Sequence, residues 1–148
     1  AAESLSLDIT YQSIPSALVQ NYVFSEASYT GGAHGLQVRK TFSFNKEGQL
    51  LTVANLFNNG LDGLVTFAKL VQKELMKREG AQSDWIADGA GAKEDNYSSF
   101  VVTDTGVTIL FDPYQVAPYS DGAIDITISA QDFPGIGNPE IFQSLLTR

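Results

Sequence analysis

Apolar and polar residues alternate along several short segments of the chain, and this alternation predicts β-strands. The clearest segment is residues 36–44, where the apolar side chains share one face and only Lys40 interrupts them. The apolar members of this segment are Leu36, Val38, Phe42 and Phe44, and the polar members are Gln37, Arg39, Thr41 and Ser43. Further strands are predicted over residues 5–10, 19–29, 100–103, 107–111 and 124–129.

A helical period replaces the alternation after the Asn58-Asn59-Gly60 turn. Apolar residues recur there at steps of three and four, which predicts a long amphipathic helix over residues 61–79 with Gly80 as its C-terminal cap. Thr52 is the predicted N-cap of a short helical turn that ends near Phe57, and a second short helix is predicted over residues 139–146. Residues 81–98 are interpreted as a loop, with room for one turn of helix, that Trp85 anchors in the core.

Strands that surround one long helix indicate an α+β fold, an antiparallel β-sheet packed against one long α-helix. A length of 148 residues fits a single domain over residues 1–148, and a hydrophobic content of 43% is sufficient for a core.

Composition narrows the possible partners. The net charge of −8 argues against nucleic acid and anionic membrane surfaces but permits a cationic protein. The absence of cysteine excludes disulfides and thiolate sites, and with one histidine the chain is expected to hold no metal and no cofactor. No run approaches the roughly 18 apolar residues of a membrane span. The Ala1-Ala2-Glu3 start without methionine is consistent with removal of an upstream signal or anchor.

The segment 29–35, Tyr-Thr-Gly-Gly-Ala-His-Gly, is the densest in special backbone chemistry. Gly31, Gly32 and Gly35 predict a turn between two strands that few other residues could form. His34 has two possible roles: a local hydrogen bond that supports the turn, or a base, ligand or pH switch. The absence of a second histidine or cysteine favours the structural role.

The segment 112–122, Asp-Pro-Tyr-Gln-Val-Ala-Pro-Tyr-Ser-Asp-Gly, is the second unusual stretch. Its two prolines predict a rigid extended connection that ends at Gly122, and Gly106, in the preceding hairpin, is predicted to be left-handed. Its flat rings and carboxylates suit a sugar or a protein surface, although the tyrosines could equally pack inward. The candidate ligand-binding residues of the two segments are Tyr29, His34, Asp112, Tyr114, Tyr119 and Asp121.

These two segments, in order with Lys-Thr-Phe-Ser-Phe and Leu-Thr-Val-Ala-Asn-Leu-Phe between them, resemble a bacterial extracytoplasmic family of domains of unknown function. The family includes the lysozyme-sensing ectodomain of an anti-sigma factor and the accessory domain of some peptidoglycan deacetylases. The resemblance covers about residues 20–130, and residues 1–19 are a candidate remnant of the companion domain that often precedes this one.

The resemblance implies a non-catalytic binding or sensory module of the cell envelope, outside the cytoplasm, with any membrane tether outside this chain. The implied ligand is a cationic protein such as lysozyme or a cell-wall glycan. An accessory or catalytic domain of a peptidoglycan-modifying enzyme and a purely structural domain are the alternatives. Glu26, Asp112 and Asp121 are candidate carboxylates by residue type for the catalytic reading.

The two unusual segments are expected to meet in space, because both adjoin strands and neighbouring strands bring their connections together. This contact would give His34 a tyrosine, aspartate or backbone partner from residues 112–122.

Overall fold

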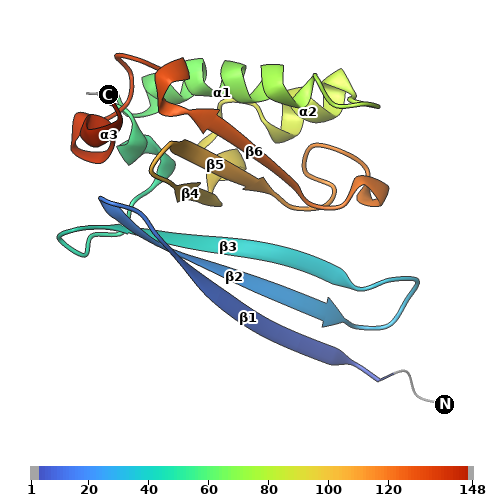
Figure 1. Cartoon of the computed structure of the whole chain (residues 1–148). Coiled ribbons are helices and arrows are strands. Elements are labelled where there is room, and N and C mark those ends of the chain that lie inside the picture. Colours follow the sequence, from blue (N-terminus) through green and yellow to red (C-terminus); the bar gives the residue numbers. More distant parts are fainter. Residues whose placement is uncertain (1–3, 147–148) are drawn as a thin grey trace.

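Within residues 4–146, which the computed structural model describes, six strands form two separate antiparallel sheets instead of the single sheet predicted. The α+β class is confirmed, with three α-helices among these residues. In Figure 1 the first sheet lies below the second, and α1 lies above the second sheet. No helix in this part of the chain is long and apolar enough to cross a membrane.

The first sheet has the order β1-β2-β3, formed by β1 (Ser6–Pro15), β2 (Val19–Tyr29) and β3 (Leu36–Asn45). Its register places Ile9 opposite Glu26 and Glu26 opposite Val38, so these three side chains share one face. Asp8, Ala27 and Gln37 form the neighbouring row on the other face. Strand β1 begins close to its predicted position but continues five residues further, to Pro15.

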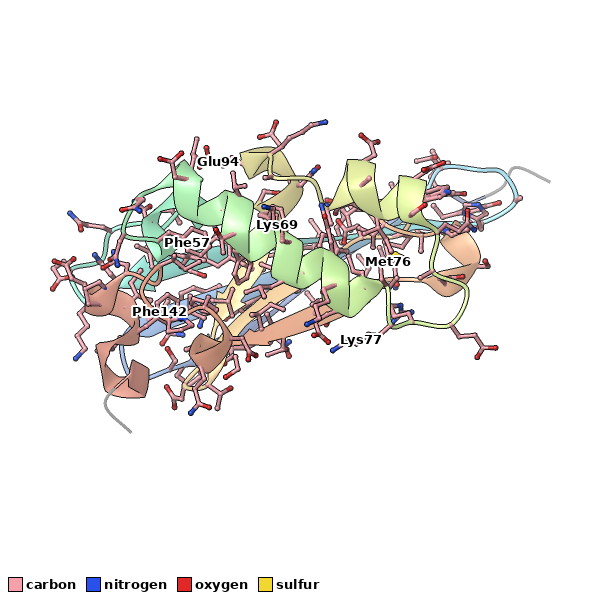
Figure 2. The ribbon with its side chains drawn as sticks, turned by 90° about the horizontal axis from the view of Figure 1, so that it is seen from above. Phe57, Lys69, Met76, Lys77, Glu94 and Phe142 are labelled. Carbon is pink, nitrogen blue, oxygen red and sulfur yellow. The ribbon has the colours of Figure 1, made fainter. Side chains whose placement is uncertain are left out.

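The second sheet has the order β4-β5-β6 and carries the helices. Its strands are β4 (Phe100–Val102), β5 (Gly106–Phe111) and β6 (Ile124–Ser129), and the helices are α1 (Leu61–Leu75), α2 (Ser83–Gly89) and α3 (Pro139–Leu146). Helix α1 packs along β6. Figure 2 shows the helix from above, with Lys69 on it and with Met76 and Lys77 just beyond its C-terminal end.

Helix α1 has 15 residues and is shorter than the predicted range of 61–79. Every residue from Met76 to Gly80 is exposed, so no apolar face continues the helix past Leu75. The backbone N–H groups of Lys77 and Arg78 bond three residues back, and Gly80 has φ +74° in the turn beyond the helix. The basic residues expected in the last helical turns therefore belong to this exit turn.

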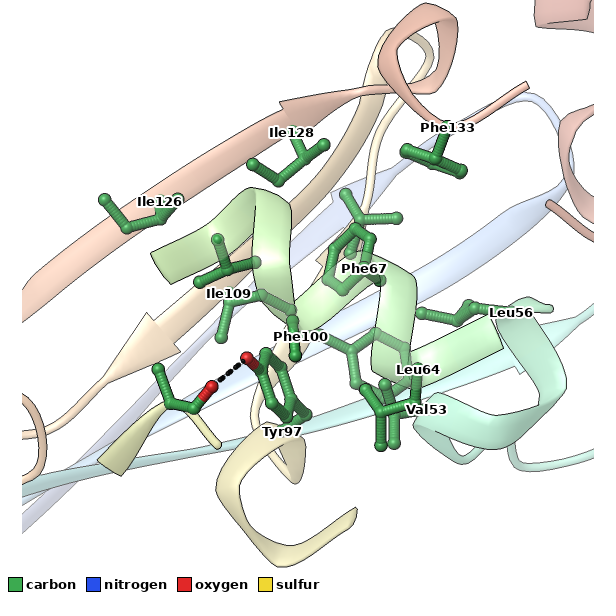
Figure 3. Packing of buried hydrophobic residues seen from close by; sticks show 14 of the residues in the cluster. Val53, Leu56, Leu64, Phe67, Tyr97, Phe100, Ile109, Ile126, Ile128 and Phe133 are labelled. Atoms are coloured by element: carbon green, nitrogen blue, oxygen red, sulfur yellow. Dashed lines mark hydrogen bonds between the residues drawn. The ribbon is translucent and has the colours of Figure 1, made fainter. Parts of the chain in front are cut away.

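The main core lies between α1 and the second sheet. Phe67 is fully buried and makes edge contacts with Tyr97 and Phe133 at centroid distances of 6.2 and 5.5 Å (Figure 3). The Tyr97 hydroxyl donates a hydrogen bond of 2.7 Å to the Ala90 carbonyl, and burial raises the pKa of Tyr97 well above its usual value. The segment 81–98, predicted as a loop with room for one turn of helix, thus supplies a short helix and a buried aromatic residue.

Two predictions in this region are wrong. Trp85 is only half-buried, and its neighbour Ile86 is the residue of α2 that enters the core. Gly106 does not have the left-handed backbone predicted for it; instead, a Cβ at this position would overlap with the Ile128 carbonyl. Glycine is needed there because β6 approaches the backbone of β5 closely.

The first sheet meets the second through its polar face. Fully buried Asn21 accepts a hydrogen bond from Val102 N at 3.0 Å and donates to Val102 O at 2.8 Å, and the Thr41 hydroxyl accepts from Phe100 N. Among the described residues, the apolar part of this layer is a small cluster of Val23, Val101 and Leu110, together with Val19 of β2, which joins the main core. The two sheets are therefore joined largely by hydrogen bonds.

Candidate functional site

The segments 29–35 and 112–122 meet in space, as expected. The rings of His34 and Tyr119 stack at a centroid distance of 4.0 Å, and Tyr114 extends the stack, 5.3 Å from Tyr119. The Tyr119 hydroxyl donates to the Gly35 carbonyl at 3.1 Å, and His34 Nδ1 lies 3.0 Å from the same oxygen. The partner of His34 is thus a tyrosine, one of the three kinds expected.

Two glycines of the first segment serve different purposes. Gly32 has φ +115° with open space where a Cβ would point, so its backbone conformation is what requires glycine. Gly35 lacks a positive φ, but a Cβ there would lie 2.9 Å from the Ser28 carbonyl oxygen. The Tyr29 hydroxyl also bonds to the Gly32 carbonyl at 2.9 Å. The turn is held by its own side chains and by Tyr119.

A cleft of about 490 Å³ opens between the first sheet and the connection that precedes β6, beside this contact. Strands β1, β2 and β3 form one wall, which includes Asp8, Tyr29 and Gln37, and the segment 112–122 forms the other, which includes Pro113 and Tyr119. We call this space the main cleft. The side chains of Asp8 and Gln37 are exposed and make no hydrogen bond with another residue in the described part of the chain.

A smaller cavity of about 180 Å³ adjoins the main cleft and shares Asp8, Ala27 and Gln37 with it. Its polar groups are centred on Arg39, whose Nη2 lies 2.7 Å from an Asp125 carboxylate oxygen and whose Nε lies 3.7 Å from Asp112. Arg39 Nε is buried, and among the described residues no acceptor lies within hydrogen-bonding distance of it. The Arg39 guanidinium is therefore bonded through Nη2, and its Nε is, among the described residues, the one buried side-chain donor without an acceptor beside this cavity.

Burial raises the pKa of Asp112, because desolvation penalises the carboxylate. The Arg39 backbone N–H, 3.0 Å from Asp112 Oδ1, and the Arg39 charge oppose this effect without overcoming it. Asp112 therefore connects β3 to the start of the segment 112–122, and the pKa of its carboxyl is raised above its ordinary value.

The structure distributes the predicted ligand-binding residues over different places. Tyr29 and Tyr119 line the main cleft, and Asp112 lines the smaller cavity. His34 is exposed and stacks on Tyr119, and Tyr114 is half exposed with φ +72°. Asp121 lies elsewhere, in a depression beside Leu75 and Ile124, because the helical turn at residues 119–121 turns it away. This turn also shows that residues 112–122 are not extended throughout.

The sequence did not single out Asp8, Gln37 and Arg39 as site residues. All three are polar positions of predicted strands, and alternation alone does not show which face of a strand looks into a cleft. A face turned to solvent and a face turned to a second layer have the same period of alternation, so the period does not distinguish them. The one signal in the sequence is the density of polar residues on one face of β3.

Two layered antiparallel sheets, a helix on one of them and a cleft between the first sheet and the segment 112–122 define the class of the domain. The family described as "Protein of unknown function (DUF3298)" matches residues 54–131, more than half of the chain. This chain belongs to that family.

Two relatives with longer chains match as well. Peptidoglycan-N-acetylmuramic acid deacetylase PdaC of Bacillus subtilis is 34% identical over 98 residues, which are 64% of this chain and 21% of PdaC. Immunogenic protein MPT64 of Mycobacterium tuberculosis is 32% identical over 121 residues, 80% of this chain and 53% of MPT64. The chain thus spans between a fifth and about half of these relatives, and the resemblance to a domain of peptidoglycan deacetylases is confirmed.

Two solved structures share the fold. A DUF3298 family protein of Bacteroides fragilis superposes with a TM-score of 0.77 at 19% identity, over 98% of this chain and 59% of that protein. Another from Pseudomonas aeruginosa gives 0.67 at 20% identity, over 93% and 64%. At these identities the likeness establishes the fold alone.

Proposed function

We propose that this chain is a non-catalytic binding module of the bacterial cell envelope, located outside the cytoplasm, which recognises a cell-wall glycan in the main cleft. Any membrane attachment is through a tether outside the chain. The family match and the relative whose name includes peptidoglycan support this setting. The observation that carries the proposal is the main cleft, with tyrosines and unbonded polar side chains in its walls.

The chemistry of the cleft suits a sugar. Glycan sites combine an aromatic surface for the apolar face of a ring with fixed polar groups for its hydroxyls. Tyr29 supplies the first feature, because the ring of Tyr119 already packs against His34 and Tyr114, and Asp8 and Gln37 supply the second. The volume of about 490 Å³ lies in the usual range for a small-molecule site and accommodates one or two sugar rings.

The positions of the carboxylates support binding over catalysis. The register places the Glu26 side chain on the outer face of the first sheet, whereas Asp112 lines the smaller cavity on the other face, and Asp121 lies beside α1 and β6 in a different depression. Asp112 is engaged by Arg39 through a backbone hydrogen bond and a charge contact. A pair of carboxylates flanking one glycosidic bond, as glycoside hydrolysis requires, is not formed by these three candidates.

Titration of the ¹⁵N-labelled chain with a disaccharide-peptide fragment of peptidoglycan tests the proposal. We expect saturable shifts for the amides of Asp8, Tyr29 and Gln37, with smaller effects elsewhere. Gln37→Ala and Asp8→Ala should each weaken binding at least about fivefold, since each removes a hydrogen bond to the ligand. Gln131→Ala and Asp132→Ala, exposed positions far along the chain, are the matched controls. Absent binding, or equal loss in the controls, would contradict the proposal.

A cationic protein such as lysozyme is the second candidate ligand, and the net charge of −8 favours it. Sedimentation of the chain with lysozyme should then show a complex of fixed stoichiometry. The complex should survive at about 0.15 M salt, where weak long-range attraction is screened. If the glycan titration shows no binding and lysozyme forms such a complex, the ligand is the cationic protein and not the glycan.

A further inference from the structure

The outer face of the first sheet, opposite the main cleft, is unusually apolar. The most exposed apolar side chains lie on β1 and just before it: Leu5, Leu7, Ile9 and Tyr11 are 71, 64, 56 and 67% exposed. The register places Phe24 and Phe42 of β2 and β3 on this face as well. Tyr11 stacks on Phe24 at 5.5 Å, and Phe24 meets Phe42 edge-on at 5.6 Å. We call these side chains the outer apolar face.

Nothing in the described part of the chain covers this face. The second sheet is different, because α1 packs on it and buries its apolar residues. The first sheet instead presents its polar side to the second sheet and its apolar side outward. Contiguous exposed apolar surface of this kind marks an interaction site in soluble proteins.

The charges on the face restrict which partner fits. The chain carries a net charge of −8, so two copies repel one another across most of their surface. Over the paired rows of the outer face the only charged residues are Glu26 and Lys40, which cancel. This surface is therefore one through which two copies can approach without net repulsion.

We propose that a second copy of this chain covers the outer apolar face, the two first sheets packing face to face about a two-fold axis. Three strands of about ten residues cover roughly 14 by 33 Å. Two such faces bury on the order of 1,000 Å², which reaches the lower limit of a specific interface. Side chains from two sheets interdigitate at a spacing of about 10 Å, as in β-sandwiches. The main cleft, on the other side of the first sheet, stays open in this dimer.

Sedimentation velocity over a range of concentrations tests the dimer. We expect the wild-type chain to change from monomer to dimer as concentration rises to about 500 μM. The double variant Leu7→Glu with Ile9→Glu should raise the dissociation constant at least about tenfold, since it places four carboxylates in the interface. Both residues are exposed in the monomer, so its thermal midpoint should change little.

The matched control is Val65→Glu with Met76→Glu, which adds the same charge at half-exposed apolar positions at α1 (Figure 2 shows Met76). This variant should dimerise like the wild type. A wild-type chain that stays monomeric up to that concentration overturns the proposal, as does an equal effect of the two double variants. Binding of the monomer to lipid vesicles or to a different protein through Leu7 and Ile9, without dimer formation, also overturns it.

Discussion

Asn21 uses its whole side-chain amide to join the two sheets. Its Nδ2 donates to the carbonyls of Ile14 and Val102, each at 2.8 Å, and its Oδ1 accepts from Val102 N and from the Ser43 hydroxyl. A buried amide with every position filled stabilises the fold mainly because each partner would otherwise be left unsatisfied.

We therefore expect Asn21→Leu to lower the free energy of unfolding by about 2–4 kcal/mol, although it adds apolar surface. The backbone N–H and C=O of Val102 would lose their partner in a buried layer. Urea denaturation measures the change. Asn59→Ala is the control, because Asn59 is exposed and its side chain makes no hydrogen bond with the described residues. A cost as small as that of the control would contradict this role.

Replacement of Gly32 and replacement of Gly106 should each destabilise the fold, for different reasons. Gly32→Val should cost about 1–3 kcal/mol through backbone strain alone, since nothing lies within 4 Å of the added Cβ. Gly106→Ala should cost more, because its Cβ would overlap with the Ile128 carbonyl and force β5 and β6 apart. Thermal unfolding of both variants measures which substitution costs more stability. Gly48→Ala is a further comparison, because Gly48 also has a positive φ and open space where a Cβ would point. An unchanged midpoint for Gly32→Val would contradict the strain argument.

Asp112 makes stability depend on pH in a direction that the raised pKa determines. The folded protein holds the proton of Asp112 more tightly than the unfolded chain does. Its contribution is therefore fully present below the usual Asp pKa of about 3.9 and is lost as pH rises through the higher folded pKa. Asp112→Asn keeps an acceptor for the Arg39 N–H but cannot ionise.

Wild type should consequently lose stability relative to Asp112→Asn as the pH rises from about 3.5 into the mildly acidic range. Urea denaturation of the two proteins at several pH values measures the difference, and Asp62→Asn on the exposed side of α1 is the control. If wild type gains on the variant with rising pH, the Arg39 charge outweighs burial at this carboxyl, contrary to the expectation.

At the scale of elements, the sequence predicts most strands and the helix, because their periods of two and about three and a half residues reflect local geometry. The position of β3 follows from its alternation, but its orientation does not. Its apolar row faces solvent and its polar row, including Arg39 and Ser43, faces the second sheet. A hydrophobic pattern identifies two faces and cannot say which one a second layer will cover.

The candidate site shows the same division. The contact between residues 29–35 and 112–122 could be predicted, since unusual turns at strand ends come together in a sheet protein. The wall of the main cleft could not, because Asp8 and Gln37 are ordinary strand residues until the sheets separate around them. Long-range layering, which local periodicity does not encode, decides their role.

A double-mutant cycle between His34 and Tyr119 measures how firmly the two segments are docked. We expect His34→Ala and Tyr119→Leu to show a coupling of about 0.5–1.5 kcal/mol, the range for a stacked aromatic pair. Tyr119→Phe should retain the stack and lose only the bond to Gly35. His34→Ala with Tyr22→Leu is the control cycle and should be additive. No coupling in the first cycle would show that the stack does not hold the turn.

At the scale of the whole molecule, the two apolar clusters are very unequal. The main core unites α1, the second sheet and α3 and takes only Val19 from the described strands of the first sheet, whereas the layer between the sheets contains Val23, Val101 and Leu110 with Ile14 at its margin. The thin layer lies beside the main cleft, which opens between the first sheet and the segment 112–122, and β1 runs away from the second sheet toward its beginning (Figure 1). The thin layer implies two levels of stability within one domain.

Hydrogen exchange of the native protein should show these two levels. Amides of β5 and α1 should exchange only through global unfolding, whereas amides of β1 should exchange earlier, through local separation of the first sheet. Val23→Ala should increase exchange in β1 and β3 selectively, because Val23 is the contribution of β2 to the small cluster. Val71→Ala in the main core is the matched control and should speed exchange in every element, since it lowers the global free energy of unfolding. Uniform protection across both sheets, or a global response to Val23→Ala, would mean that the sheets unfold as one unit despite the thin layer between them.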